Sequence, residues 1–146
     1  MAGPEVTSEI RAHTPCGCIA ALKWTYSTAE PHTIVVDTRL LSLASDELRS
    51  VGPDQPDTTW MFDRSMLHTA FTEPGLLVGI GDVQVEVDGA DVVLHFLDID
   101  DGSRCPVRQA AVWVRRFLQR TYEFVPSGAE RVDVDAAITG LLRGVR

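Results

Sequence analysis

The sequence predicts an α+β domain, an antiparallel β-sheet or barrel-like core with helices packed on it. Segments whose apolar residues recur every second position lie between residues 19 and 97, and the longest segment with helical periodicity follows them. Strands that come first and helices that come last are typical of this class rather than of alternating α/β folds. The chain has 146 residues, enough for one domain, and we expect a single domain over residues 1–146.

The clearest strand signal begins at Ile19. Alternate residues from Ala20 to Tyr26 are apolar, which predicts a strand with one buried face. Ser27–Pro31 has the composition of a turn, and the β-branched run Thr33–Asp37 follows it. The two segments therefore predict an antiparallel hairpin.

Strand character resumes at residues 58–62, where Trp60 and Phe62 fall on one face. Asp63 is well placed to cap a short helix. That helix would direct a set of apolar side chains inward, namely Met66, Leu67, Ala70 and Phe71.

A second hairpin is predicted further along the chain. Val83–Val87 alternates cleanly, Asp88-Gly89 is a strong hairpin turn signal, and Val92–Leu97 returns along the first strand. A turn at residues 100–102 then leads a short strand toward Pro106.

Two helices are predicted in the last third of the chain. The first starts directly after Pro106 and stops before Val125-Pro126, and its apolar face consists of Val107, Ala110, Ala111, Val114, Phe117, Leu118 and Thr121. Arg108, Arg115, Gln119 and Arg120 lie mostly on the opposite face. The second helix, over residues 133–145, carries a shorter apolar stripe and closes the chain.

Two regions lack a clear period. Residues 1–18 are predicted to form a loose N-terminus, in which Ile10–His13 is the earliest segment with strand character. Residues 40–57 contain several leucines but are interrupted by Gly52-Pro53 and Pro56, so we expect a long inserted loop off the sheet.

Composition and charge narrow the function. The formal net charge is −8, whereas a nucleic-acid-binding protein normally carries a concentrated basic surface, so nucleic acid is disfavoured as the main partner. The sequence has neither a signal peptide nor an apolar run long enough to span a membrane, which predicts a cytoplasmic location without membrane insertion. Three cysteines in a reducing compartment predict no disulfide.

Metal and phosphate sites are only weakly suggested. His13, Cys16, Cys18 and Cys105 could supply four zinc ligands, but a single Cys-x-Cys lacks the paired Cys-x-x-Cys arrangement, and buried free thiols are common. Gly79–Asp82 precedes a strand rather than a helix, which is the wrong context for a phosphate loop. The acidic run at residues 98–101 is better interpreted as a solvated turn than as a calcium loop.

We expect no enzyme activity and no cofactor. The sequence has no Gly-x-Ser-x-Gly elbow, and its four histidines stand in unrelated contexts. His95 lies within an apolar strand, where a hydrogen-bonded core or edge histidine is more common than a general base. Asp133 and Asp135 stand at a predicted helix start, where capping explains them.

Four pieces of the sequence together resemble the SsgA-like family of actinobacterial sporulation and cell-division proteins. They are Leu22–Tyr26 with Ala29–Ile34, the Trp60-x-Phe62-x-Arg64 motif with Leu67, the Gly79-x-Gly81-Asp82 segment with Val83 and Val85, and the stretch from Phe117 to Glu130 with Asp133 and Leu141-Leu142. They keep the family's order from about Leu22 to the C-terminus. The chain departs from the family in having His32 where tyrosine is usual and a longer loop at residues 40–57.

The resemblance implies a non-catalytic regulator of septum-site selection and septation during sporulation. It implies that the protein recruits or positions FtsZ, another SsgA-like protein or other divisome and cell-wall proteins, and that it concentrates at division septa. It also implies a homotrimer with a fold similar to the Whirly single-stranded nucleic-acid binders. A Whirly-like single-stranded nucleic-acid-binding module is the alternative function.

Candidate partner-binding residues follow from the predicted helix surface and from the family motif. Trp113, Arg115, Arg116 and Arg120 lie on or beside the polar face of the helix. Arg64 belongs to the Trp60-x-Phe62-x-Arg64 motif and could instead pair with an acid or a helix end. For Trp60 and Phe62 a core role is favoured, because aromatic strand residues usually pack inward.

Overall fold

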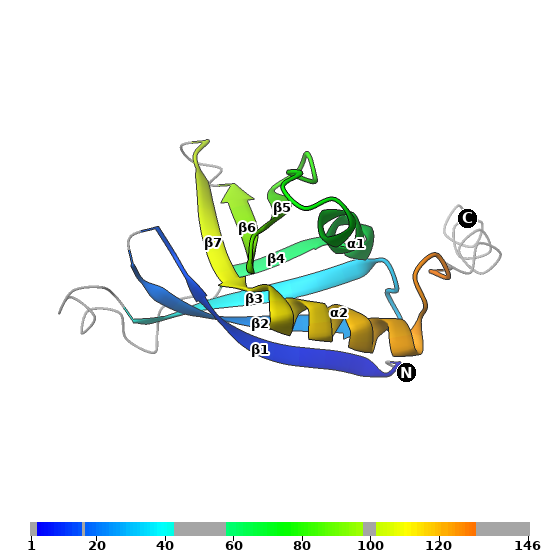
Figure 1. Ribbon diagram of the computed structural model, residues 1–146. Coiled ribbons are helices and arrows are strands. Elements are labelled where there is room, and N and C mark those ends of the chain that lie inside the picture. The colour runs from blue at the N-terminus through cyan, green and yellow to red at the C-terminus, as the bar shows by residue number, and fades with distance from the viewer. Residues whose placement is uncertain (1–2, 16, 43–57, 98–101, 131–146) are drawn as a thin grey trace, which may run out of the picture.

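The computed structural model describes residues 3–15, 17–42, 58–97 and 102–130, which contain seven strands and two helices (Figure 1). Their order is β1 (Glu5–His13), β2 (Ile19–Ser27), β3 (Thr33–Ser42), β4 (Thr58–Asp63), α1 (Arg64–Thr72), β5 (Val83–Asp88), β6 (Asp91–Leu97), β7 (Arg104–Ala110) and α2 (Ala111–Phe124). The described part is therefore α+β, as the sequence predicts.

The strands form one antiparallel sheet in the order β4-β3-β2-β1-β7-β6-β5. Each half is a meander of strands that follow one another along the chain, β1 to β4 on one side and β5 to β7 on the other. The two halves meet where Ala12 pairs with Gln109 and His13 pairs with Arg108. This short pairing of β1 with β7, which we call the β1–β7 seam, joins the two halves into one sheet.

The sheet curls so that its two ends approach each other. Trp60 of β4 stacks on Phe96 of β6, with ring centroids 4.6 Å apart and ring planes 17° apart. Since the sheet order places these strands near opposite ends, the stack brings the two ends together. This agrees with the barrel-like core expected from the sequence.

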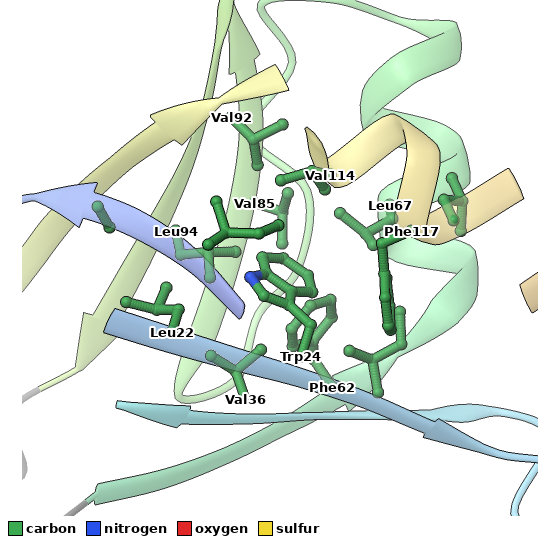
Figure 2. Close-up of a cluster of buried hydrophobic side chains, with 14 of the residues drawn as sticks. Leu22, Trp24, Val36, Phe62, Leu67, Val85, Val92, Leu94, Val114 and Phe117 are labelled. Atoms are coloured by element: carbon green, nitrogen blue, oxygen red, sulfur yellow. The ribbon is translucent and has the colours of Figure 1, made fainter. Parts of the chain in front are cut away.

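Trp24 lies at the centre of the core (Figure 2). Its ring meets Phe62 edge-on at 5.9 Å and Phe117 of α2 at 5.6 Å. Its indole Nε1–H donates to Oε1 of Gln109 at 3.0 Å, so the buried donor is satisfied by a side chain from β7. The tryptophan thus joins β2, β4, β7 and α2 through one side chain.

Each helix covers the core with one apolar face. Asp63 caps α1 by accepting a hydrogen bond from the Ser65 amide at 2.8 Å, and Leu67 and Ala70 are buried beneath it. The buried residues of α2 are Ala111, Val114, Phe117, Leu118 and Thr121, the same face that the sequence pattern indicates. Helix α2 lies beside β1 (Figure 1).

Three sequence predictions are wrong at the level of elements. Residues 5–9 are not loose but belong to β1, which also contains the segment Ile10–His13 for which strand character is predicted; Val6, Ile10 and Ala12 of this strand are buried. The partly exposed Ser8 interrupts this apolar alternation, which hides the strand in the sequence. A strand at this position is nevertheless central, because it pairs with β2 along its whole length.

The second wrong prediction is the start of the long helix, which the sequence places directly after Pro106. Residues 107–110 continue β7, and α2 begins at Ala111. Val107 and Gln109 point inward with a period of two, and pairing of β7 with β6 stabilises the extended backbone. Thirdly, β3 runs on to Ser42, so Leu40–Ser42 belong to the sheet rather than to an inserted loop.

The remaining predicted elements are either confirmed or not covered. Both hairpins form, with β2 paired to β3 and β5 paired to β6 through the turn at Asp88-Gly89, where Gly89 has a φ of 59°. The rest of the predicted loop, residues 43–57, the acidic turn at residues 98–101 and the second helix at residues 133–145 lie outside the described residues.

Candidate interaction surface

The outer face of α2 combines apolar and basic side chains. Because the inner face of the helix faces the core, the intervening positions project to solvent. Val112, Trp113 and Phe124 are exposed by 55%, 49% and 50%, which is high for large apolar side chains at the surface. We call the exposed residues of α2, namely Val112, Trp113, Arg115, Arg116, Gln119, Arg120, Glu123 and Phe124, the α2 face.

The predicted basic residues of this face are held against aromatic rings or backbone. The guanidinium of Arg116 lies over the Trp113 ring, 5.2 Å from its centroid, and that of Arg115 lies over Phe71 of α1 at 4.9 Å. Arg120 donates from Nη1 to the carbonyl oxygen of Thr7 at 3.2 Å. These contacts orient three cations at the surface without neutralising them.

A groove of about 600 Å³ lies beside Trp113. It is lined by Glu9, Ile10, Arg11 and His13 of β1, by Asp91 of β6, by Arg108, Gln109 and Ala110 of β7 and by Trp113 of α2. We call it the β1–α2 groove. Trp113 thus belongs both to the α2 face and to this groove, which makes it the residue that connects the two.

Arg108 at the rim of the groove is already paired. It donates to Asp88 at 2.8 Å and to Asp91 at 3.4 Å, and all three side chains are about half exposed. The hydrogen bond from Arg108 to Asp88 raises the pKa of Arg108, so this group stays charged. Exposed pairs of this kind contribute little to stability, so we interpret them mainly as a fixed charge pattern around the groove.

Arg64 does not lie at the surface, in contrast to the candidate role suggested by its motif. It is 1% exposed and its guanidinium lies between the rings of Tyr26 and Tyr122, each centroid 4.9 Å away. It donates to the Val125 carbonyl at 2.6 Å, to the Thr121 hydroxyl at 3.3 Å and to the Pro126 carbonyl at 3.3 Å, and it forms an ion pair with Glu130. Arg64 therefore holds the end of α2, which is the alternative that the sequence left open.

The environment of Arg64 shifts the pKa values of its neighbours. Desolvation raises the pKa of Glu130, but the hydrogen bond and charge of Arg64 with further backbone hydrogen bonds outweigh it, so the pKa lies below its ordinary value. Burial raises the pKa values of Tyr26 and Tyr122. At neutral pH the cluster therefore holds one guanidinium, one carboxylate and two neutral phenols.

The residues considered as possible zinc ligands do not form a cluster in the described part of the chain. Cys18 is buried and Cys105 is exposed, and no three metal-ligating side chains come together among the residues that the structure describes. Cys16 lies outside those residues. His95 of β6, a strand flanked by β5 and β7, lies 2.8 Å from Glu86 across the β5–β6 hairpin, so it is a hydrogen-bonded histidine within the sheet, as the sequence favours.

The structure therefore brings four of the five candidate residues onto one helix and places the fifth inside the protein. Two features of the surface are absent from the candidates derived from the sequence. Phe71 supports Arg115 from α1, and β1 supplies one wall of the groove. The period of α2 alone could not reveal either, because both come from elements distant in the sequence.

The comparisons with known proteins agree with this fold. The family model for SsgA, described as a Streptomyces sporulation and cell division protein, matches residues 20–130. The chain belongs to the SsgA family. No curated protein sequence matches the chain.

Solved structures of SsgA-like proteins share the fold of this SsgA-family chain. One is an SsgA-like sporulation-specific cell division protein from Thermobifida fusca, with a TM-score of 0.72 and 22% identity over 96% of this chain and 97% of the other. Another comes from a study of SsgB mutations that correlate with longitudinal cell division during sporulation of Streptomyces coelicolor. It has a TM-score of 0.68 and 19% identity over 87% and 93% of the two chains. The resemblance stated from the sequence motifs is thereby confirmed at the level of the family.

The two helices of this SsgA-family protein can also be compared with the length and apolarity that a membrane span requires. Within the described ranges, neither helix is long and apolar enough to cross a membrane.

Proposed function

We propose that this SsgA-family protein is a non-catalytic regulator of sporulation-specific cell division that recruits or positions FtsZ or another divisome protein through the α2 face. The observation that carries the proposal is the exposed cluster of Trp113, Arg115 and Arg116 on a helix whose other face is fully committed to the core. Exposed tryptophan and arginine are the residue types that most often dominate protein–protein binding energy.

The α2 face also suits an adaptor because it is rigid. A helix packed along its length on the sheet presents its outer side chains in fixed positions, so binding requires little ordering of the backbone. The family membership supplies the setting in sporulation and cell division. An acidic partner would complement the three arginines.

The direct test is binding to FtsZ of the same host, by co-sedimentation with polymers and by a solution affinity assay at two salt concentrations. We expect saturable binding that weakens at higher salt, and a loss of roughly tenfold or more in affinity when Arg115→Glu and Arg116→Glu are combined. Trp113→Ala should weaken binding with less effect on its salt dependence. Arg39→Glu combined with Arg104→Glu is the matched control, since it changes the net charge equally at exposed positions away from α2.

Lack of FtsZ binding by a folded protein would reject direct recruitment of FtsZ. Capture of a second SsgA-like protein or a cell-wall protein, with the same dependence on Arg115 and Arg116, would then identify the partner class. The proposal includes a homotrimer in solution, which sedimentation equilibrium would check. It also includes cytoplasmic protein concentrated at septa, which a fluorescent fusion in sporulating hyphae would reveal.

A Whirly-like single-stranded nucleic-acid-binding module is the second candidate function. The observation that favours it is the exposed ring of Trp113 beside Arg116, since aromatic rings and cations together bind single-stranded bases and phosphates. The net charge of −8 argues against it. Fluorescence anisotropy with labelled oligo-dT distinguishes the two, because nucleic-acid binding would weaken steeply with salt and would not require FtsZ.

A further inference from the structure

The strand β1 is paired on one side along its whole length but on the other side only at its end. Its partner β2 covers residues 5–13, whereas β7 pairs only with Ala12 and His13 before the chain turns into α2. Residues 5–11 therefore have a second edge without a strand beside it in the described structure. Open strand edges are templates for pairing with another chain.

The direction of the backbone groups on this edge follows from the alternation of an antiparallel strand. At even-numbered positions the groups point toward β2, since the Pro4 carbonyl accepts from the Thr28 amide and the Thr14 amide donates to the Cys18 carbonyl. The Thr7 carbonyl points the other way, toward α2, where Arg120 bonds it. The N–H and C=O groups of Glu9 and the N–H of Arg11 share the parity of Thr7 and so face the β1–α2 groove, whereas the antiparallel register of Ala12 with Gln109 assigns the Arg11 carbonyl to the Ala110 amide of β7.

Helix α2 lies along the open edge of β1 and forms the other side of the groove. Arg120 meets β1 at Thr7, and Trp113, two turns earlier in α2, meets the groove beside Glu9 and Arg11. Arg116 lies between them on the same side of the helix, against the Trp113 ring. An aromatic ring and two guanidinium groups thus lie along the open edge of β1.

We propose that the open edge of β1 from Thr7 to Arg11 binds an extended acidic peptide segment of a partner protein, which adds to the sheet as a strand. Its backbone pairs with Glu9 and with the amide of Arg11, alternate acidic side chains meet Arg116 and Arg120, and an apolar side chain covers Trp113. The charge of the α2 wall selects the acidic class. Entry of the strand displaces Arg120 from the Thr7 carbonyl and frees its guanidinium for a carboxylate.

The inference rests on the proposed function of the α2 face and assigns it a peptide chemistry. The probe is a capped nonapeptide of alternating valine and glutamate, and its counterpart carries lysine in place of glutamate. Binding is measured by NMR titration together with amide hydrogen exchange. At saturation with the acidic peptide, exchange of the Glu9 and Arg11 amides should slow by roughly tenfold or more, while the Ser8 and Ile10 amides, which face β2, should stay unchanged.

Two pairs of variants make the test specific. Arg116→Glu should weaken binding of the acidic peptide by about tenfold, whereas the control Arg39→Glu, which makes the same charge change at an exposed position of β3, should leave the affinity within about twofold. Glu9→Pro removes an amide on the open side only, so the protein should fold and lose peptide binding. Ser8→Pro removes an amide of the β1–β2 ladder and should instead destabilise the fold.

Several results would overturn the inference. One is binding of the lysine peptide as tightly as the acidic peptide, and another is binding of the acidic peptide without slower amide exchange at Glu9 and Arg11. Slow exchange of these amides in the free protein that depends on protein concentration would instead show that a second copy of the chain occupies the edge. Binding of oligo-dT with the same dependence on Arg116 would assign the groove to nucleic acid. FtsZ binding that needs Arg115 and Arg116 but survives Glu9→Pro would leave the proposed function standing while rejecting strand addition.

Discussion

Arg64 is the residue on which the position of α2 depends most directly. It begins α1, yet its hydrogen bonds reach Thr121, Val125, Pro126 and Glu130 around the end of α2. A guanidinium taken out of water is costly unless its donors are paired, and here the pairing is to one carboxylate, one hydroxyl and two carbonyls. Its stacking between two tyrosines makes lysine a poor substitute.

We predict that Arg64→Met lowers the free energy of unfolding by about 3 kcal/mol, because it leaves the carboxylate of Glu130 without its cation and the carbonyls of Val125 and Pro126 without the Arg64 donor. Urea unfolding followed by circular dichroism measures the change. Arg115→Met, an exposed arginine on α2, is the control and should cost under about 1 kcal/mol. A similar loss for both variants would contradict the structural role of Arg64.

The pKa of Glu130 predicts a pH dependence of stability. Its value in the folded protein is below its ordinary value of 4.5, so the unfolded chain takes up the proton first. The contribution of Glu130 is therefore complete above about pH 4.5 and is lost as the pH falls through the folded pKa. The melting temperature of Glu130→Gln should accordingly fall less steeply than that of the wild type as the pH is lowered below about 4.5.

Glu123→Gln, on the exposed side of α2, is the matched control for this measurement. Its melting temperature should follow the wild-type curve throughout the same range. Parallel curves for the wild type and Glu130→Gln would show that the ion pair with Arg64 does not contribute to folding.

At the scale of elements, the sequence predicts those strands and helices whose burial follows a single period. Trp24 and Phe62 in strands and Phe117 in α2 are buried as their spacing indicates. The stretch from Val107 to Ala110 fits a helical period and a period of two equally well, and only pairing with β6 decides between them. The first half of β1 is missed because Ser8 interrupts an otherwise apolar face, whereas Ile10–His13 shows strand character in the sequence.

The candidate surface, like the elements, is predictable from the sequence only where a single helix period determines it. The outward position of Trp113, Arg115, Arg116 and Arg120 follows from the period of one helix. The burial of Arg64 depends on a chain segment about sixty residues away, and no local pattern carries that information. The groove likewise requires knowing that β1 and β7 are neighbours.

The start of α2 offers a stabilising substitution. Ala110 occupies the N-cap position and makes no side-chain hydrogen bond to the first turn. Ala110→Ser should supply an acceptor for the amide of Val112 or Trp113 and raise the free energy of unfolding by about 1 kcal/mol. Ala90→Ser in the β5–β6 turn serves as the control, and equal effects of the two changes would exclude capping as the cause.

At the scale of the whole molecule, the stack of Trp60 on Phe96 closes the curled sheet. We predict that Trp60→Leu lowers the free energy of unfolding by roughly 1–3 kcal/mol, since it removes both an aromatic pair and part of the buried surface. Thermal unfolding measures the loss. Met61→Leu, at the adjacent and 65% exposed position, should leave stability almost unchanged. A neutral Trp60→Leu would show that the sheet ends are held by the remaining core alone.

The short seam between β1 and β7 also governs the order in which the chain can assemble. Contacts within each meander join residues close in sequence, but the seam joins Ala12 to Gln109, and closing so long a loop carries an entropic cost that the nearer pairings avoid. A nascent chain that ends before β7 can form the first meander, but it lacks α2, so Trp24 and the rest of that core face stay without their cover. The completed core is therefore a property of nearly the whole polypeptide, and its N-terminal half remains aggregation-prone until synthesis passes α2.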